Sequence, residues 1–320
     1  MYVISVTDEG EFALIRRITA RLTTTADVLL GPGDDAAVIA APDGRVVATT
    51  DLMVEGRHFR RDWSTAYDVG RKAAAANLAD VVAMGARPTA LLVGLGAPAD
   101  LSLDWVDGLT DGLRDECGLV GAAVVGGDIT QSDTLTVAVT ALGDLGGAPP
   151  LTRSGARPGD HVVLIGWPGR AAAGLALLAA GYPDHPLVAA HRRPAPGYAA
   201  ALLLAAGGDV TAMTDVSDGL VADLGHIAAA SGASVELTAA DLPIDSELLA
   251  AADLLGVDAF EWIAGGGDDH CFAATLADEA RESGHVPGIG RVVATAPGGK
   301  PTVRFTDREL PVRAGHEHFR

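Results

Sequence analysis

The chain has 320 residues, of which 48% are hydrophobic, and its formal net charge is −19 at pH 7. The length predicts two domains, and the acidic balance excludes nucleic acid and anionic membranes as non-specific partners. No apolar run reaches the roughly 20 residues of a membrane span. Residues 1–10 lack a signal-peptide pattern, so we expect a soluble, cytoplasmic protein.

The first half of the chain alternates helical patterns with short runs of β-branched residues. In order, they predict a helix at 11–23, a strand at 46–50 that ends at Asp51, a helix at 66–84, a strand at 89–95, a helix at 102–117, and strands at 122–125 and 134–142. Segment 143–150 is the part richest in turn-forming residues. It predicts a boundary between a domain at 1–148 and another at 149–320.

The second half begins a new alternation of strand and helix. It predicts a strand at 161–165, a Gly-rich turn at 166–169, helices at 170–180 and 198–206, a strand at 211–214, a helix at 219–230 and a last strand at 302–305. This mixture predicts an α/β (α+β) fold in two domains.

Short aspartate motifs among Gly, Ala, Ser and Thr are the most informative feature of the chain. Asp outnumbers Glu by 31 to 11. Carboxylates in apolar, turn-forming sequence are costly to bury unpaired, so they usually face a cation. Oxygen ligands in this number suit Mg²⁺. The motifs are Gly33-Asp34-Asp35-Ala36, Thr49-Thr50-Asp51, Asn77-Leu78-Ala79-Asp80, Gly126-Gly127-Asp128, Asp215-Val216-Ser217-Asp218-Gly219 and Gly266-Gly267-Asp268-Asp269.

Each motif also has a purely structural explanation. Asp80 on an Ala-rich helix is compatible with a surface carboxylate, and either Ser217 or Asp218 is compatible with a helix N-cap. The turn at 166–169 suits a tight turn better than a phosphate loop, and a histidine in a loop, such as His58, is usually solvated. The joint presence of the motifs favours a binding function.

Other nucleotide and metal motifs are missing from the sequence. No Gly-x-x-x-x-Gly-Lys-Ser/Thr pattern occurs, and Lys72 and Lys300 are the only lysines, which excludes a P-loop. The two cysteines, Cys117 and Cys271, are far apart in the sequence and predict buried thiols in a reducing compartment.

Taken in order, the motifs resemble those of thiamine-monophosphate kinases, which belong to the ATP-using superfamily of aminoimidazole ribonucleotide synthetase. The similarity extends from Gly10 to Phe319. Besides the aspartate motifs it includes Gly10-Glu11-Phe12, His58-Phe59, Ala83-Met84-Gly85-Ala86, Leu151-Thr152-Arg153-Ser154-Gly155 and Asp223-Leu224-Gly225-His226. The resemblance implies ATP-dependent phosphorylation of thiamine phosphate to thiamine diphosphate. It also implies an N-terminal mixed-sheet domain that binds ATP and Mg²⁺ and forms a homodimer, followed by an α/β domain.

The resemblance also assigns roles to individual residues. It places the ligands of several Mg²⁺ ions on Asp35, Thr49, Thr50, Asp51, Asp80, Asp128, Asp215 and Asp218, with Asp34 adjacent to them. ATP contacts fall on Gly127, Asp128, Arg153 and Ser217, and thiamine phosphate contacts on His58, Asp268 and His316. This chain has Asp268 where the family usually has Glu, and His316 where it often has a large aromatic residue.

The acceptor in this reaction is a phosphate monoester that is largely a dianion at pH 7, so it needs no general base. We therefore expect metal-assisted in-line transfer without a covalent enzyme intermediate. Two alternatives are open from the sequence: another ATP-using enzyme of the same superfamily, or a non-catalytic, acidic, cation-binding protein.

Overall fold

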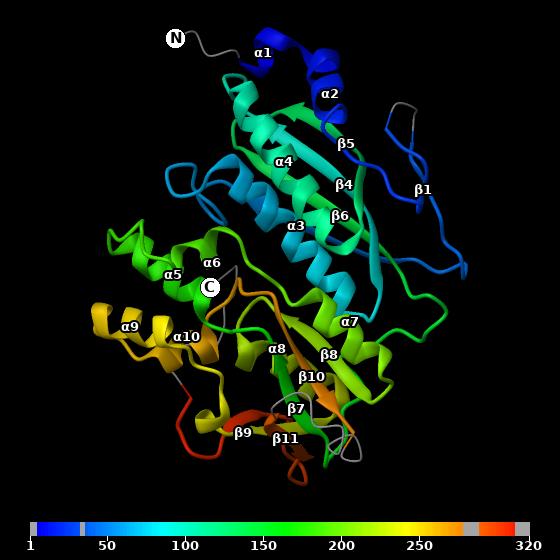
Figure 1. Cartoon of the computed structure of the whole chain (residues 1–320). Coiled ribbons are helices and arrows are strands. Elements are labelled where there is room, and N and C mark those ends of the chain that lie inside the picture. The colour runs from blue at the N-terminus through cyan, green and yellow to red at the C-terminus, as the bar shows by residue number, and fades with distance from the viewer. Residues whose placement is uncertain (1–4, 33–35, 278–287, 311–320) are drawn as a thin grey trace. The chain divides into compact units, whose positions relative to one another are not determined.

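The computed structural model describes residues 5–32, 36–277 and 288–310 and is drawn in Figure 1. The chain forms two compact units: Met1–Val81 with Ala86–Ala148, and Val82–Gly85 with Pro149–Arg320. Each unit is built on its own main sheet, with helices packed against it. In the described residues, no helix is long and apolar enough to cross a membrane.

The first unit contains a mixed four-stranded sheet in the order β3-β6-β4-β5. Strands β3 and β4 pair antiparallel with β6, and β4 pairs parallel with β5. Its elements are α1 Val6–Glu9, α2 Glu11–Thr19, β1 Val28–Leu30, β2 Val38–Ile39, β3 Val47–Val54, α3 Ala66–Ala83, β4 Arg87–Ala97, α4 Leu103–Val120, β5 Ala123–Gln131 and β6 Thr136–Asp144.

Helices α3 and α4 pack unusually closely because a glycine on each helix faces the backbone of the other. A Cβ on Gly70 would collide with the carbonyl oxygen of Leu109, and a Cβ on Gly112 would collide with that of Tyr67. The next turns of α3 include Leu78, which is fully buried. This packing fixes α3, the helix that carries Asn77 and Asp80.

The second unit contains a six-stranded sheet in the order β12-β9-β11-β7-β10-β8, antiparallel except for the pair β12 and β9. Its elements are β7 His161–Ile165, α5 Arg170–Ala179, α6 Val188–Arg192, α7 Tyr198–Ala206, β8 Val210–Val216, α8 Leu220–Ser231, β9 Ala233–Leu237, the 3₁₀ turn η1 Ala239–Asp241, α9 Ser246–Leu255, α10 Ala259–Gly265, β10 Cys271–Leu276, β11 Gly288–Ala294 and β12 Val303–Phe305.

Several strands extend further than the sequence predicts, and three of these carry site positions. Strand β3 continues through Asp51 to Val54, and β8 includes Asp215. Strand β5 runs through Gly126-Gly127-Asp128 instead of ending before it. Glycine and aspartate normally weaken strand predictions, but Gly127 is required inside this strand because a Cβ there would collide with the Val93 carbonyl oxygen of β4.

Candidate active site

Two predicted ligand positions of the first unit are tied to helix α3 by hydrogen bonds. The Thr49 hydroxyl donates to the Asp80 carboxylate, with an Oγ1–Oδ2 distance of 2.8 Å. The backbone N–H of Asp51 donates to Oδ1 of Asn77, with an N–O distance of 3.0 Å. Asn77 is only 1% exposed, and its amide also donates to the Ala73 carbonyl at 3.0 Å. Strand β3 and helix α3 therefore present Thr49, Asp51 and Asp80 together.

Thr50 lies on the other face of the same sheet. Side chains alternate along a strand, so Thr49 and Asp51 share one face and Thr50 takes the opposite one. The Thr50 hydroxyl donates to the Val139 carbonyl at 3.0 Å and lies 3.1 Å from the Thr140 hydroxyl. The Thr50 hydroxyl therefore does not lie with Thr49, Asp51 and Asp80 on the α3 side of the sheet.

Asp128 lies far from this group across the sheet. It is on β5 and pairs in register with Gly94 of β4, whereas Asp51 is on β3 at the opposite edge. With strands about 4.8 Å apart, three strand spacings place the two backbones roughly 14 Å from each other. Magnesium ligands lie about 2.1 Å from the ion. One ion therefore cannot bridge Asp51 and Asp128 in this sheet.

Asp215 in the second unit is a buried carboxylate with an imidazole partner. It is 3% exposed, and its Oδ2 lies 3.1 Å from Nδ1 of His270, which is itself buried. Strand β8 ends at Val216, so the half-buried Ser217 and Asp218 follow in the turn before α8. The N-cap of α8 is Gly219, which has no side chain to cap the helix. The alternative in which Ser217 or Asp218 is simply the N-cap of this helix is therefore wrong.

The Asp223 carboxylate takes the place of that cap. Its Oδ2 accepts the backbone N–H groups of Ser217, Asp218 and Gly219 at 3.0, 3.0 and 3.1 Å. Burial raises the pKa of Asp223 to about 7, and the nearby charge of Asp215 acts in the same direction, while the bonds to Asp218 and Gly219 oppose both. A cation bound in this region would lower that pKa again.

Asp268 lies in a strained, firmly held loop. Its φ is 67° and that of His270 is 51°, values that non-glycine residues rarely adopt. The Asp268 N–H donates to the Ser217 carbonyl at 2.8 Å, and the His270 N–H donates to that of Val216 at 2.9 Å. The loop therefore holds Asp268 beside the turn that carries Ser217.

Asp269 connects the same loop to helix α5. Its carboxylate accepts the N–H groups of Gly169 and Ala171 at 2.6 and 2.7 Å. Burial raises the pKa of Asp269 to about 7, although both hydrogen bonds act to lower it. Two amides at the start of α5 are thus already bonded to a carboxylate, which favours the tight-turn explanation of segment 166–169 over a phosphate loop.

His58 lies in the loop between β3 and α3. Its Nδ1 accepts the N–H of Val54 at 3.0 Å, which assigns the proton of the neutral ring to Nε2. The ammonium of Lys72, a residue that is 5% exposed, lies 3.5 Å from the His58 carbonyl oxygen. The Val54 contact thus fixes the orientation of the ring at the start of this loop.

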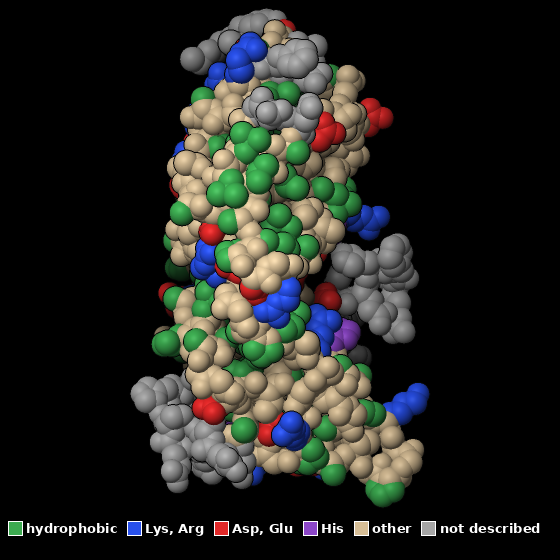
Figure 2. All heavy atoms as spheres, turned by 90° about the vertical axis from the view of Figure 1, so that its right-hand side faces the viewer, with side chains coloured by type: hydrophobic (Ala, Val, Ile, Leu, Met, Phe, Trp, Pro, Cys, Tyr) green, Lys and Arg blue, Asp and Glu red, His purple; other side chains and the backbone are tan. Residues whose placement is uncertain are grey.

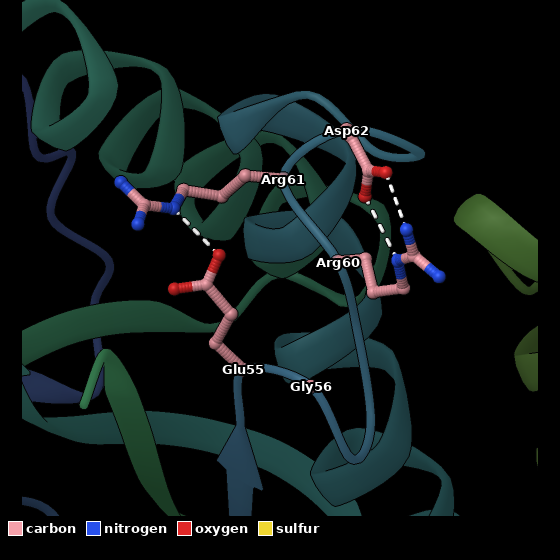
Figure 3. Close-up of a pocket in the computed structure, with 5 residues that line it drawn as sticks. All are labelled: Glu55, Gly56, Arg60, Arg61 and Asp62. Carbon is pink, nitrogen blue, oxygen red and sulfur yellow. Dashed lines mark hydrogen bonds and ion pairs between the residues drawn. The ribbon is translucent and has the colours of Figure 1, made fainter.

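An open pocket of about 570 Å³ lies next to this loop segment and is shown in Figure 3. Arg60 and Arg61 line it, but each guanidinium is paired with a carboxylate. Arg60 bonds to Asp62 at 2.9 and 2.5 Å, and Arg61 bonds to Glu55 at 2.6 Å. The paired charges balance, so this pocket is not by itself an anion or cation site.

Of the remaining predicted site residues, the structure describes Arg153 but not the residues near 34 and 316. Arg153 is exposed, and its carbonyl accepts the Ser231 hydroxyl at 3.0 Å. Asp34, Asp35 and His316 lie outside the described residues, and their roles stay predictions. Within the described ranges, no three His, Cys, Asp or Glu side chains group together as a metal site.

Sequence analysis gave no role in the site to Asn77, Asp223, Asp269 or His270. Asn77, Asp223 and His270 each hydrogen-bond to a predicted ligand residue, and Asp269 ties the loop that carries Asp268 to the start of α5. Only Asp223 had a local signal, since its partners lie four to six positions before it. The partners of Asp269 are 98 and 100 positions away, which no local pattern reveals.

Comparison with known proteins agrees with this architecture. Residues 33–145 match the family described as AIR synthase related protein, N-terminal domain, and residues 157–294 match the corresponding C-terminal domain. The chain is 46% identical to the thiamine-monophosphate kinase of Mycobacterium tuberculosis, over 97% of this chain and 92% of that protein. The chain belongs to the thiamine-monophosphate kinase family. The family member from Corynebacterium glutamicum is 43% identical over 91% of this chain and 88% of its own length.

Solved structures of the family have the same fold. The thiamine-monophosphate kinase of Stenotrophomonas maltophilia aligns with a TM-score of 0.80 at 35% identity, covering 94% of this chain and 98% of that one. The structure of AaThiL complexed with AMPPCP and TMP aligns over the full length of both chains, with a TM-score of 0.77 and 30% identity. The mixed α/β fold predicted from the sequence is confirmed.

Proposed function

We propose that this chain catalyses the ATP-dependent phosphorylation of thiamine phosphate to thiamine diphosphate. The observation that carries the proposal is full-length similarity to AaThiL complexed with AMPPCP and TMP. The carboxylates and hydroxyl presented by β3 and α3 are what a magnesium-dependent phosphotransferase requires. The enzyme works in the cytoplasm, with ATP and thiamine phosphate as its ligands and neither nucleic acid nor membrane as a partner.

Charge repulsion is the main obstacle to this reaction. The acceptor phosphate has a second pKa of about 6 and is largely a dianion at pH 7, so it is already a competent nucleophile. Two unit charges about 4 Å apart repel by roughly 4 kcal/mol at an effective dielectric of 20. The chain has only two lysines, Lys72 and Lys300, with which to offset this repulsion. The net charge of −19 leaves an excess of carboxylates, which we propose act by recruiting cations.

The donor atoms in the first unit fit Mg²⁺, since Thr49, Asp51 and Asp80 offer only oxygen. Asp51 and Asp80 would hold one ion, and Asp128 another, because the two edges of the sheet are too far apart for one ion. Asp215 and Asp218 supply the corresponding carboxylates of the second unit. Bound Mg²⁺ neutralises phosphate charge and aligns the two phosphates for in-line transfer.

Hydrogen bonds from the protein orient the substrates in this proposal. His58, whose ring is oriented by the Val54 N–H, contacts thiamine phosphate. Arg153 and Ser217 contact ATP, and Asp268 contacts thiamine phosphate from its held loop. Since no side chain has to remove a proton, catalysis is positioning and charge neutralisation, with no covalent enzyme intermediate.

We also propose that the first unit forms the homodimer interface. Leu52 on β3 is 54% exposed and Leu92 on β4 is 38% exposed. The β-sheet register puts both on the face opposite Thr49 and Asp51, which α3 contacts. Figure 2 shows hydrophobic side chains gathered in the upper part of the view, which the first unit occupies. A sheet face with two exposed leucines suits a second copy of the chain.

An assay of acceptor choice tests the proposed activity. The purified protein is incubated with ATP and Mg²⁺ and, separately, thiamine, thiamine phosphate or an aminoimidazole ribonucleotide precursor, while ADP release and thiamine diphosphate are measured. We expect stoichiometric ADP and thiamine diphosphate with thiamine phosphate alone. ADP release with another acceptor, or no ADP release with any of them, would contradict the proposal.

A further inference from the structure

The turn 217–219, which carries two predicted ligand residues, depends on a side chain outside the predicted site. Helix α8 starts at Leu220 after Gly219, whose φ is 121° and which has no side chain to cap the helix. Asp223, 1% exposed in the first turn of α8, bonds to the three consecutive N–H groups of Ser217, Asp218 and Gly219 through one oxygen. These bonds fix the direction of three successive peptide groups.

The carbonyl side of the same segment is also fixed. The Ser217 carbonyl accepts the N–H of Asp268 at 2.8 Å, and the Val216 carbonyl accepts that of His270 at 2.9 Å. A Cβ on Gly219 would lie 2.9 Å from the backbone of Gly265, which leaves the turn little room to shift. With its backbone groups bonded on both sides, the turn can direct the side chains of Ser217 and Asp218 in only a narrow range.

The choice of residue at position 223 is informative. A neutral Asn or Ser serves as well as Asp in capping a helix. The Asp223 carboxylate lies close enough to Asp215 and Asp218 for their charges to oppose its own. If position 223 only capped the helix, a neutral residue would therefore be favoured there. A single oxygen that accepts three N–H groups is instead favoured by the negative charge of a carboxylate, because hydrogen bonds to a charged acceptor are stronger.

We propose that Asp223 is a positioning residue that aims Ser217 and Asp218 at the magnesium-bound phosphates of ATP. This inference rests on the proposed function, because it takes the ATP and metal roles of Ser217 and Asp218 from there. Asp223 itself touches neither substrate nor metal. Its effect passes through the three backbone N–H groups that it holds.

The test measures binding rather than turnover. Affinity for a non-hydrolysable ATP analogue with Mg²⁺ is measured by calorimetry for the wild type, Asp223→Asn and Asp223→Ser, together with the melting temperature. Both substitutions at position 223 are made so that the test can be completed even if one of the two variants does not fold. The matched control is Asp245→Ala, which removes the helix cap of α9, where Asp245 accepts the Leu248 N–H at 2.7 Å. We expect at least a tenfold loss of analogue affinity at position 223 and less than twofold in the control.

A double-mutant cycle separates positioning from general destabilisation. If Asp223 acts through Ser217 and Asp218, then Asp223→Asn should change analogue affinity less than twofold in a Ser217→Ala/Asp218→Asn background. Equal losses in both backgrounds, or unchanged affinity with a lowered melting temperature, would overturn the proposal. Product formation by the wild type is measured separately, so a protein that binds the analogue but makes no thiamine diphosphate refutes the proposed function and not the role of Asp223.

Discussion

Replacing Asn77 by Ala tests whether helix α3 positions Asp51. The substitution removes the acceptor of the Asp51 N–H and the donor to the Ala73 carbonyl, both at 3.0 Å, from a side chain that is 1% exposed. Loss of a partner for a poorly hydrated N–H costs about 1–3 kcal/mol. The higher helix propensity of Ala returns roughly 0.5 kcal/mol. We therefore expect the free energy of unfolding to fall by about 0.5–2.5 kcal/mol.

The same change should affect catalysis more than stability. Since Asp51 would lose its anchor to α3, we expect turnover to fall at least tenfold under conditions where the protein stays folded. Urea unfolding and the rate of thiamine diphosphate formation are measured on the same preparations. The control is Thr110→Val in α4, which removes a buried helix-internal bond to the Val106 carbonyl at 2.8 Å. Normal turnover in Asn77→Ala, with the expected loss of stability, would refute this reasoning.

Three further predictions concern the nucleotide strand, pH and assembly. Gly127→Ala forces β5 away from the Val93 carbonyl, so analogue affinity should fall and unfolding free energy should drop by about 1–3 kcal/mol. The Asp269 pKa, raised from 3.8 to about 7, means that the folded state holds a proton that the unfolded state releases. The contribution of this group to the free energy of unfolding, measured in EDTA as the difference between the wild type and Asp269→Asn, should therefore be fully present below pH 4 and be lost as pH rises to 7, by up to about 4 kcal/mol. Leu52→Glu should convert the dimer to monomers in sedimentation experiments.

Each of these predictions has a comparison that sharpens it. Gly118→Ala, at a helix position with nothing near the added Cβ, should leave affinity unchanged. Leu203→Glu alters a residue of α7 that is 76% exposed and should leave the oligomeric state unchanged. A wild-type stability that rises relative to that of Asp269→Asn between pH 4 and 7 would contradict the pH prediction. Equal affinities in the two glycine variants, or a monomeric wild type, would contradict the other two.

The sequence located the aspartate motifs because their chemistry is local: a carboxylate among Gly, Ala and Thr is unusual by itself. It misplaced strand ends for the same reason. Asp51 and Gly127 look like strand breakers, but Asp51 lies on an edge strand where its side chain is not buried, and Gly127 is needed for the close approach of β4. Whether a strand lies at the edge of a sheet, and how closely its neighbour approaches it, depend on the whole sheet. The sequence of one segment does not specify either property.

The supporting residues were harder to predict because their roles depend on distant partners. Asn77 was noticed for its spacing from Asp80, yet its bond to Asp51 spans 26 positions. Asp269 looked like part of a substrate motif, but it is buried and caps α5. The role of Asp223 could have been predicted, because its partners lie only a few positions before it. The signal was Gly219, which precedes the helix and has no side chain with which to cap it.

The central claim is that carboxylates gather divalent ions so that two phosphates can meet. The most direct test is the rate of thiamine diphosphate formation against free Mg²⁺, at saturating ATP and thiamine phosphate, for the wild type, Asp51→Asn and the exposed control Asp133→Asn. We predict a wild-type rate that keeps rising after all ATP is magnesium-bound, a lower rate by orders of magnitude in Asp51→Asn, and a wild-type curve for Asp133→Asn. Coincident curves for all three proteins, saturating at one Mg²⁺ per ATP, would contradict the account.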